Sequence, residues 1–387
     1  EPDRDGYENA SGTLRAGHRW SAGEIEATAL YASGRNEYDG TFANETDFVE
    51  RVVTLRGRLN ATERWSISAL AGVSNDDQDN FLDDPASTDG RVLASRFETE
   101  RRNVSLQSDF VLSATHAFTV GVDYYDDRVH GTTEFEARSR DNLGAFAQYQ
   151  AALGAHRLLA SARYDDNEQF GSYETGSLAW KWMLDEHWSL SAAWGTAFGA
   201  PTFNDLYFPG FSNPELDPET SRSYEVGIGW TSTPVQIAFT AYERHVDDLI
   251  VYDASIFAPN NLNTARIRGA ELDVDASLGP WRMSLGYSGI DPRNRTRGDD
   301  FDNFLPRRSR HAGHFELGRT FGALDARARV TTEGSRFDDV ANTHRLGSFA
   351  ILDLVVDYAL NDAWSVQGKL GNVFDRDYRT VRLYNQD

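Results

Sequence analysis

The most constraining feature of this sequence is a period-two alternation of side-chain character that recurs in unusually long segments. In residues 64–73, Trp65, Ile67 and the alternate residues after them lie on one face, and mostly small or polar residues lie on the other. Such alternation is the signature of a β-strand with two different faces. The segments exceed the usual strand length of roughly five or six residues and match the roughly 9–11 residues that a tilted strand needs to cross a bilayer.

About 18 segments of this kind follow one another, and no convincing amphipathic helix separates them. The expected strands lie near residues 12–20, 23–32, 50–60, 64–74, 97–111, 116–126, 143–152, 156–166, 172–183, 187–197, 221–231, 235–246, 265–278, 281–290, 309–319, 323–333, 347–359 and 363–374. The sequence therefore predicts an all-β fold.

The connections between these strands alternate between short and long. The long connections cover residues 33–49, 75–96, 127–142, 198–220, 247–264, 291–308 and 334–346, with 167–171 as a shorter member of the set. A β-sandwich has no reason to place all its long loops at one end. An outer-membrane barrel does, because it has tight periplasmic turns and extended extracellular loops. We therefore expect a transmembrane antiparallel β-barrel.

The tryptophans give an independent indication of the same fold. Seven of the nine lie within a few residues of a short turn: Trp20, Trp65, Trp182, Trp188, Trp230, Trp281 and Trp364. An aromatic girdle at a membrane interface produces this bias toward one end of the hairpins, whereas a general preference of Trp for strands does not. Acidic residues gather on the other side, most densely in 75–96.

Composition narrows the function without deciding the fold. The formal net charge of −22 argues against nucleic acid as a partner, because phosphate binding needs an excess of Lys and Arg. The chain has no Cys, so it has neither a disulfide framework nor a thiolate metal site. No apolar run is long enough for a transmembrane helix. Composition alone would also suit an acidic soluble protein.

A barrel in lipid must close, because an open edge leaves backbone groups unpaired at several kcal/mol each. The chain stops at Asp387 in what reads as the middle of a loop, and its first residues read as half of a loop. We therefore expect residues 1–387 to be one barrel domain that is truncated at both ends, with about 18 strands of a larger barrel present.

Several motifs resemble those of TonB-dependent outer-membrane receptors. The first is WGTAFGAPTFNDLY at 194–207, followed by NPELDPETS at 213–221. RHVDDLI at 244–250, NTARIRGAE at 263–271 and GKLGNVFDRDY at 368–378 are similar to later motifs of that family. The resemblance implies a 22-stranded barrel, a plug domain that is absent here, and import driven through that plug by the TonB complex. It also implies the outer membrane of a Gram-negative bacterium.

Within this family the chain most resembles the cobalamin (vitamin B12) transporters. The likeness rests on ARYDDNEQFG at 162–171, LPRR at 305–308 and the opening DRDG at 3–6. The leading substrate is therefore cobalamin. A ferric siderophore or haem is the alternative within the family, and a passive porin-like channel is the alternative outside it.

This resemblance also implies calcium in the extracellular loops. DRDG has acidic residues at alternate positions, as an EF-hand loop does, but its glycine comes too early and no helix flanks it. In cobalamin transporters, Ca²⁺ between two such loops orders the binding surface. The matching positions are Asp3, Asp5, Tyr38, Asp39 and Asp47, and they supply hard oxygen ligands of the kind that Ca²⁺ prefers. The alternative is that these are solvated loop acids.

The expected substrate-binding residues are one arginine and four aromatic residues. Arg307 resembles a loop arginine that contacts the corrinoid; alternatively it is an interior arginine paired with Glu271 or Asp273. The aromatic residues lie in long loops: Phe81, Tyr207, Phe208 and Phe211. Facing the lumen, arginines such as Arg327 and Arg329 are expected to form ion-pair ladders with Glu225, Glu271, Asp273 and Asp275.

An enzyme is not expected. The nine His are scattered, and the sequence has neither a G-x-S-x-G elbow nor an H-E-x-x-H motif. Gly12 and Gly17 have P-loop spacing, but they lie on an expected strand. His311 and His314 fall on opposite strand faces and do not share a ligand easily.

Overall fold

The computed structural model describes residues 6–38, 40, 42–208, 210–253 and 256–382, and the backbone of 384–386. Eighteen strands belong to one antiparallel sheet. They are β1 (Tyr7–Trp20), β2 (Gly23–Glu37), β3 (Glu45–Thr62), β4 (Trp65–Asp83), β5 (Arg91–Ser113), β6 (His116–Gly131), β7 (Ser139–Leu153), β8 (His156–Asn167), β9 (Gly171–Met183), β10 (Trp188–Gly199), β11 (Glu219–Ser232), β12 (Val235–Asp253), β13 (Ala258–Leu278), β14 (Trp281–Asn294), β15 (His311–Phe321), β16 (Leu324–Glu333), β19 (Phe349–Ala359) and β20 (Ser365–Leu370).

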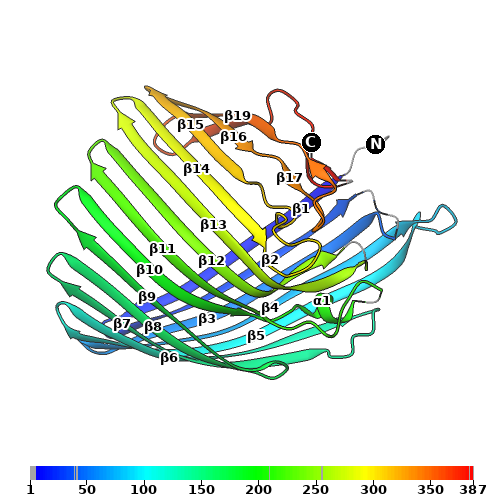
Figure 1. Ribbon diagram of the computed structural model, residues 1–387, viewed down its shortest axis with the longest axis horizontal. Coiled ribbons are helices and arrows are strands. Elements are labelled where there is room, and N and C mark those ends of the chain that lie inside the picture. The colour runs from blue at the N-terminus through cyan, green and yellow to red at the C-terminus, as the bar shows by residue number, and fades with distance from the viewer. Residues whose placement is uncertain are drawn as a thin grey trace. The chain divides into compact units, whose positions relative to one another are not determined.

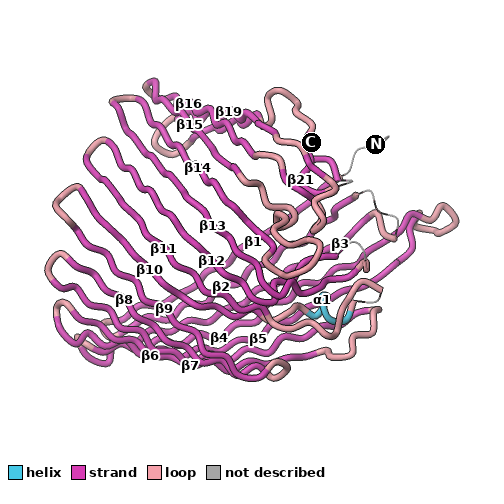
Figure 2. Tube along the Cα trace, viewed as in Figure 1, coloured by secondary structure: helices cyan, strands magenta, loops and turns pink. Residues whose placement is uncertain are grey.

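Smaller elements occupy the connections. They are α1 (Phe203–Tyr207), β17 (Arg336–Phe337) paired with β18 (Arg345–Leu346), and β21 (Tyr378–Val381) paired with β22 (Tyr384–Gln386). In Figure 2, α1 is the short cyan segment among magenta strands. Among the described residues, no helix is long and apolar enough to cross a membrane.

The chain divides into two compact units. The first contains residues up to Ala151 together with Leu159–Gly176 and Ala200–Leu216, and the second contains Ala152–Leu158, Ser177–Gly199 and the residues from Asp217 onward. In each unit, strands adjacent in sequence lie side by side and pair in antiparallel register (Figure 1). The short turns within a unit therefore all lie at the same end of its strands.

In the first unit, the register aligns apolar side chains into a row across the strands. Leu55 lies opposite Ala71, Ala71 opposite Val104, Val104 opposite Tyr124, and Tyr124 opposite Leu143. Val104 is 56% exposed and Leu143 is 53% exposed. A continuous row of exposed apolar side chains is unfavourable in water and suits a face that lies against lipid.

The second unit has an equivalent row. It runs through Trp188, Trp230, Ile237, Val274, Leu285, Phe315, Val330 and Leu352, each opposite the next in register. We call this side of each unit the apolar face and the other side the inner face. On the inner face the alternate positions are mostly polar, as the period-two pattern predicts.

All seven tryptophans expected near short turns lie at or near a strand end that meets such a turn. Trp65 and Trp281 begin β4 and β14, and Trp20 ends β1. These three side chains are 38–42% exposed. They are placed as the residues of an aromatic girdle are, where each ring contacts lipid on one side and water on the other.

The strands extend further into the long connections than the alternation indicates. The sequence predicts a loop over 75–96, but β4 continues to Asp83 and β5 begins at Arg91. Likewise β12 and β13 leave only residues 254–257 between them, where the prediction has a loop over 247–264. The prediction was wrong here because the alternation stops in these extensions while backbone pairing continues. Residues 75–80 are polar on both faces, and residues 249–252 are apolar on both faces.

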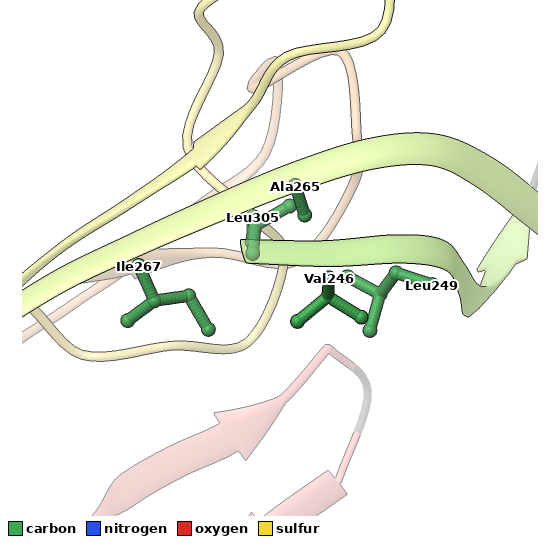
Figure 3. Packing of buried hydrophobic residues seen from close by; sticks show 5 residues of the cluster. All are labelled: Val246, Leu249, Ala265, Ile267 and Leu305. Carbon is green, nitrogen blue, oxygen red and sulfur yellow. The ribbon is translucent and has the colours of Figure 1, made fainter. Parts of the chain in front are cut away.

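A small apolar cluster stabilises the long-loop end of the second unit. Val246 and Leu249 of β12 pack with Ala265 and Ile267 of β13, and Leu305 of the following loop inserts against them (Figure 3). Leu305 is 1% exposed, and burying a leucine side chain contributes about 1.5–3 kcal/mol. The cluster therefore fixes residues 295–310 to the extended hairpin below them.

Candidate functional site

In the first unit, the α1 loop (residues 200–211) is built around a short, well-capped helix. Thr202 is its N-cap: the hydroxyl accepts a hydrogen bond from the Asp205 N–H, and the Asp205 carboxylate accepts one from the Thr202 N–H at 2.9 Å. Such a capping box satisfies two otherwise unpaired donors. Leu206 is fully buried beneath the helix. One turn of helix is thus held by its capping box and by the burial of Leu206.

Arg140 of β7 anchors the α1 loop from below. Its guanidinium donates to the Pro201 carbonyl at 2.9 Å and lies 5.0 Å from the ring centre of Phe203 and 5.7 Å from that of Phe170. The residue is only 8% exposed. A buried charge is expensive unless it is paired, so the carbonyl and the two rings offset its desolvation.

Three of the predicted substrate-binding aromatics are consecutive or nearly so on the α1 loop. The Tyr207 hydroxyl accepts a hydrogen bond from the Gln169 side chain at 2.6 Å. Phe208 and Phe211 have ring centres 6.3 Å apart and are 40% and 44% exposed. Sequence reasoning missed Arg140 and Gln169. Nothing in their local pattern indicates that they contact residues 61 and 38 positions further along the chain.

A polar cavity of about 470 Å³ lies beside the α1 loop on the inner face of the first unit. Its lining includes Arg101, Asp127, Arg140 and Phe203. Arg101 makes a two-pronged ion pair with Asp127, at 2.5 and 2.7 Å, which is the geometry of strong charge-assisted pairs. The charges in this lining are largely paired, so the cavity suits a polar ligand group or ordered water.

Asp47 belongs to a four-residue ion-pair network that joins β2, β3 and β5. Its carboxylate accepts from Arg35 at 2.9 Å and from Arg91 at 2.8 Å, and Glu45 pairs with the same two arginines. The Arg91 guanidinium also lies 3.9 Å from the ring centre of Phe81. The fourth predicted aromatic residue is therefore covered by an arginine on β5.

Of the five predicted calcium ligands, Tyr38 and Asp47 lie within the described residues. Asp3, Asp5 and Asp39 lie outside the described residues. The Tyr38 hydroxyl is 3.1 Å from the Thr46 hydroxyl, and both Asp47 oxygens are engaged by arginines. No three carboxylates or imidazoles converge in the part of the chain that is described. Asp47, as placed, does not fit a metal ligand, because two guanidinium groups already neutralise it.

In the second unit, Arg307 connects two loops. Its Nε donates to Asp338 at 2.9 Å, and its backbone N–H donates to the Phe337 carbonyl at 2.6 Å. The alternative pairing with Glu271 or Asp273 was wrong: those acids lie on β13, whereas the partner is in the loop between β16 and β19. The side chain of Arg307 remains 44% exposed, so part of it faces solvent.

The same two loops are held together by further contacts. Asn342 accepts from the Phe304 N–H and donates to the Phe304 carbonyl, each at 2.8 Å. The Phe304 ring centre lies 3.8 Å from the guanidinium of Arg293 and 4.6 Å from that of Arg310. Residues 294–310 and 334–346 thus form one surface, which we call the paired loops.

Asp339 organises the second of the paired loops. It accepts hydrogen bonds from the hydroxyl and N–H of Thr343 and from the N–H of His344, at 2.7–3.0 Å. Burial acts to raise the pKa of this carboxyl, but the hydrogen bonds outweigh it, and the pKa is lowered overall. The carboxylate form is therefore part of the loop structure.

The interior ion-pair ladder differs from the prediction. Arg327 pairs with Asp325, at 3.5 Å, and with Asp357, rather than with the acids of β11 and β13. Asp357 lies on β19, directly beside β16. On the inner face, charged residues pair with partners on the same or the adjacent strand. The sequence shows which residues are charged, but it does not show directly which strands are adjacent.

Comparison with known proteins identifies the family. Residues 2–373 match the family described as TonB dependent receptor-like, beta-barrel. Two curated relatives are the vitamin B12 transporters BtuB of Photobacterium profundum and Vibrio vulnificus, which are 28% and 29% identical. The alignments cover 100% and 98% of this chain but 64% and 62% of the relatives, so the chain spans less than two thirds of their length.

Solved structures share the fold at lower identity. The copper transporter OprC superposes with a TM-score of 0.80 at 18% identity, covering 97% of this chain and 67% of that one. The siderophore receptor PiuA of Acinetobacter baumannii gives 0.82 at 13% identity, covering 98% and 72%. These comparisons confirm the predicted all-β barrel fold. The chain belongs to the TonB-dependent receptor family, and nearly all of the chain matches the β-barrel part of that family.

Proposed function

We propose that this chain is the barrel of an outer-membrane receptor of a Gram-negative bacterium that binds cobalamin at its long-loop face. The observation that carries the proposal is the match to two vitamin B12 transporters across essentially the whole chain. The siderophore receptors and the copper transporter are similar in fold alone, at 12–18% identity. They therefore favour no substrate for this chain.

The exposed aromatic surface supports a bulky ligand. Phe208 and Phe211 present two partly exposed rings on a loop that Arg140 and Gln169 hold in place. In the second unit, Arg307 offers a half-exposed guanidinium on the paired loops. Apolar rings and a cation suit a large amphipathic chelate with amide side chains, because rings contribute contact area and the guanidinium donates hydrogen bonds.

Transport is proposed to be active, driven by the TonB complex through the plug domain that receptors of this family carry. The calcium site is part of the same proposal: Asp3, Asp5, Tyr38 and Asp39 would bind Ca²⁺ and order the loop around residue 39. Asp47 would be a calcium ligand only if the metal replaced Arg35 and Arg91 at its carboxylate.

The test is cyanocobalamin binding to the full-length protein in detergent, with and without a calcium chelator. The expected result is saturable binding that weakens at least tenfold, or about 1.4 kcal/mol, when calcium is removed. A ferric catecholate siderophore and haemin serve as competitors. Saturable binding of either one, with no binding of cyanocobalamin, would overturn the substrate assignment in favour of that ligand. Passive flux through liposomes that needs no energy source would instead indicate a porin-like channel.

A further inference from the structure

Arg319 of β15 is a charged residue on the apolar face of the second unit, at the short-turn end. β15 alternates so that Phe315, Leu317, Arg319 and Phe321 share that face. On the neighbouring strands, the positions flanking it are uncharged: Trp281, Met283 and Leu285 on β14, and Leu324, Ala326 and Ala328 on β16. A single arginine among these residues requires a physical explanation.

Two aromatic rings hold the Arg319 guanidinium in place. Its central carbon lies 4.7 Å from the ring centre of Trp281, directly opposite in register, and 4.5 Å from that of Phe321. Cation–π contacts of this kind are attractive because the negative face of each ring faces the positive charge. Trp281 and Phe321 are themselves 38% and 50% exposed, so the three side chains lie together at the surface.

Arg319 has no carboxylate partner in the described part of the chain. Its Nε is buried without a hydrogen-bond acceptor there, and no ion pair forms. The carboxylate nearest in register is Asp325, opposite Thr320, and it is bound to Thr320 and Arg282 on the other face. The protein thus positions a guanidinium beside two aromatic rings and gives its charge no carboxylate partner among the described residues.

Position along the strand decides what compensates that charge. An arginine on the lipid face is costly at the bilayer midplane but nearly neutral close to an interface. Arg319 is two residues from the turn at 322–323, next to the girdle residue Trp281. It therefore lies at headgroup depth, where phosphate oxygens are available. A guanidinium pairs with phosphate through two parallel hydrogen bonds, which a lysine ammonium does not reproduce.

We propose that Arg319, Trp281 and Phe321 form a binding site for the phosphodiester of a phospholipid in the leaflet that contacts the short turns. The guanidinium binds the phosphate, and the two rings contact the glycerol and upper acyl chain. This inference rests on the proposed membrane location. It does not depend on which ligand the receptor imports, because lipid retention is measured separately from ligand binding.

The test uses the full-length protein in a mild detergent, titrated with phosphatidylglycerol and observed by native mass spectrometry. Arg319→Gln is expected to lower occupancy of the bound lipid at least fivefold, with Arg319→Lys intermediate and Trp281→Leu weakened. Arg329→Gln removes an arginine from the inner face of the next strand and is expected to leave lipid occupancy unchanged. Heat-modifiable migration on gels verifies that each variant is folded.

Two further probes show which part of the lipid the site recognises. Diacylglycerol, which lacks the phosphate, is expected to bind weakly and equally to wild type and Arg319→Gln. Inorganic phosphate alone is expected to bind no more to wild type than to the variant. Equal phosphatidylglycerol occupancy in wild type and folded Arg319→Gln would overturn the proposal. So would Arg319-dependent binding of inorganic phosphate as strong as that of the lipid, since the site would then recognise a free anion.

Discussion

Arg307 and Asp338 join two loops of the second unit through a single 2.9 Å ion pair between residues 31 positions apart. The contact is reinforced by the Arg307 N–H, which donates to the Phe337 carbonyl. Arg307 has a positive φ of 58°, a conformation uncommon for residues other than glycine. The loop is therefore shaped so that this side chain reaches Asp338 while part of the guanidinium stays exposed.

Arg307 is proposed both to hold the paired loops together and to contact the ligand, so substitutions of Arg307 and of Asp338 are predicted to differ in their effect on binding. Arg307→Gln removes both the loop contact and any contact with ligand, so it is expected to weaken cobalamin binding about tenfold, or about 1.4 kcal/mol. Asp338→Asn removes the charge partner of Arg307 but leaves the guanidinium in place, and it is expected to cost about two- to threefold, in line with a partly exposed ion pair. Equilibrium binding of cyanocobalamin measures both. Equal losses would mean that Arg307 acts through the loop alone.

Arg140 is predicted to control the α1 loop without contacting ligand. Arg140→Leu leaves the Pro201 carbonyl without its donor and removes the charge beside Phe203 and Phe170. Faster amide hydrogen exchange over residues 202–211 is the expected result, with cobalamin affinity reduced about threefold or more. Thr202→Ala, which removes the helix cap, is expected to raise exchange in the same segment at a cost of about 1 kcal/mol.

A matched control for Arg140 is Arg128→Gln. Arg128 lies in the lining of the same cavity, but it pairs with Asp126 on its own strand rather than with the α1 loop. Unchanged exchange over 202–211 is expected for this variant. If Arg140→Leu also left that exchange unchanged, the anchoring role would be wrong.

Asp47 is predicted to be a structural residue in the ion-pair network. Asp47→Asn deprives Arg35 and Arg91 of one carboxylate and is expected to lower stability by about 1 kcal/mol or less, as for other partly exposed pairs. Calcium affinity is expected to change by no more than about twofold, or about 0.4 kcal/mol. Asp39→Asn, by contrast, is expected to weaken it at least tenfold. Calcium titration by calorimetry distinguishes the two, and a tenfold loss with Asp47→Asn would restore it as a ligand.

The parts of the structure that the sequence predicts well are those where lipid and water impose opposite demands on alternate residues. All 18 expected strands are present, because an apolar side chain at most alternate positions is what a strand between lipid and a polar interior needs. Residue 83 of β4 and residue 91 of β5 could not be predicted as strand ends, since beyond the membrane both faces meet water and no alternation remains.

The contacts at the candidate site are less predictable for a different reason. Phe208, Phe211 and Arg307 are conspicuous by type, being large or charged residues in long loops, and the structure leaves each of them partly exposed. Their supporting partners Arg140 and Asp338 lie far away in sequence and have no local signature. Only the pairing of the strands brings such residues to the loops they hold.

Acid is predicted to loosen the paired loops through Asp339. Because folding lowers the pKa of this carboxyl from its ordinary value of 3.8, its contribution to stability is fully present above that value. The contribution is lost as the pH falls through the lower pKa of the folded state. Amide exchange over residues 338–346, corrected for the intrinsic rate, should therefore rise below about pH 4. Asp339→Asn should show the raised exchange already at pH 7 and no further rise on acidification.

A charge added midway along the apolar face of β16 is predicted to destabilise the barrel much more than one added to its inner face. Ala328 lies midway along the strand on the apolar face, opposite Leu317 and Leu354, whereas Leu324 on the same face adjoins the turn. Ala328→Arg is expected to destabilise the folded barrel by about 2–4 kcal/mol and Leu324→Arg by about 0–1, because the cost of a charge in lipid falls toward the interface. Thr331→Arg adds the same charge on the inner face and should cost less than about 1 kcal/mol. Reversible urea unfolding of the full-length protein from phospholipid vesicles gives all three values. Equal costs at Ala328 and Thr331 would mean that the apolar face of this unit does not lie against lipid.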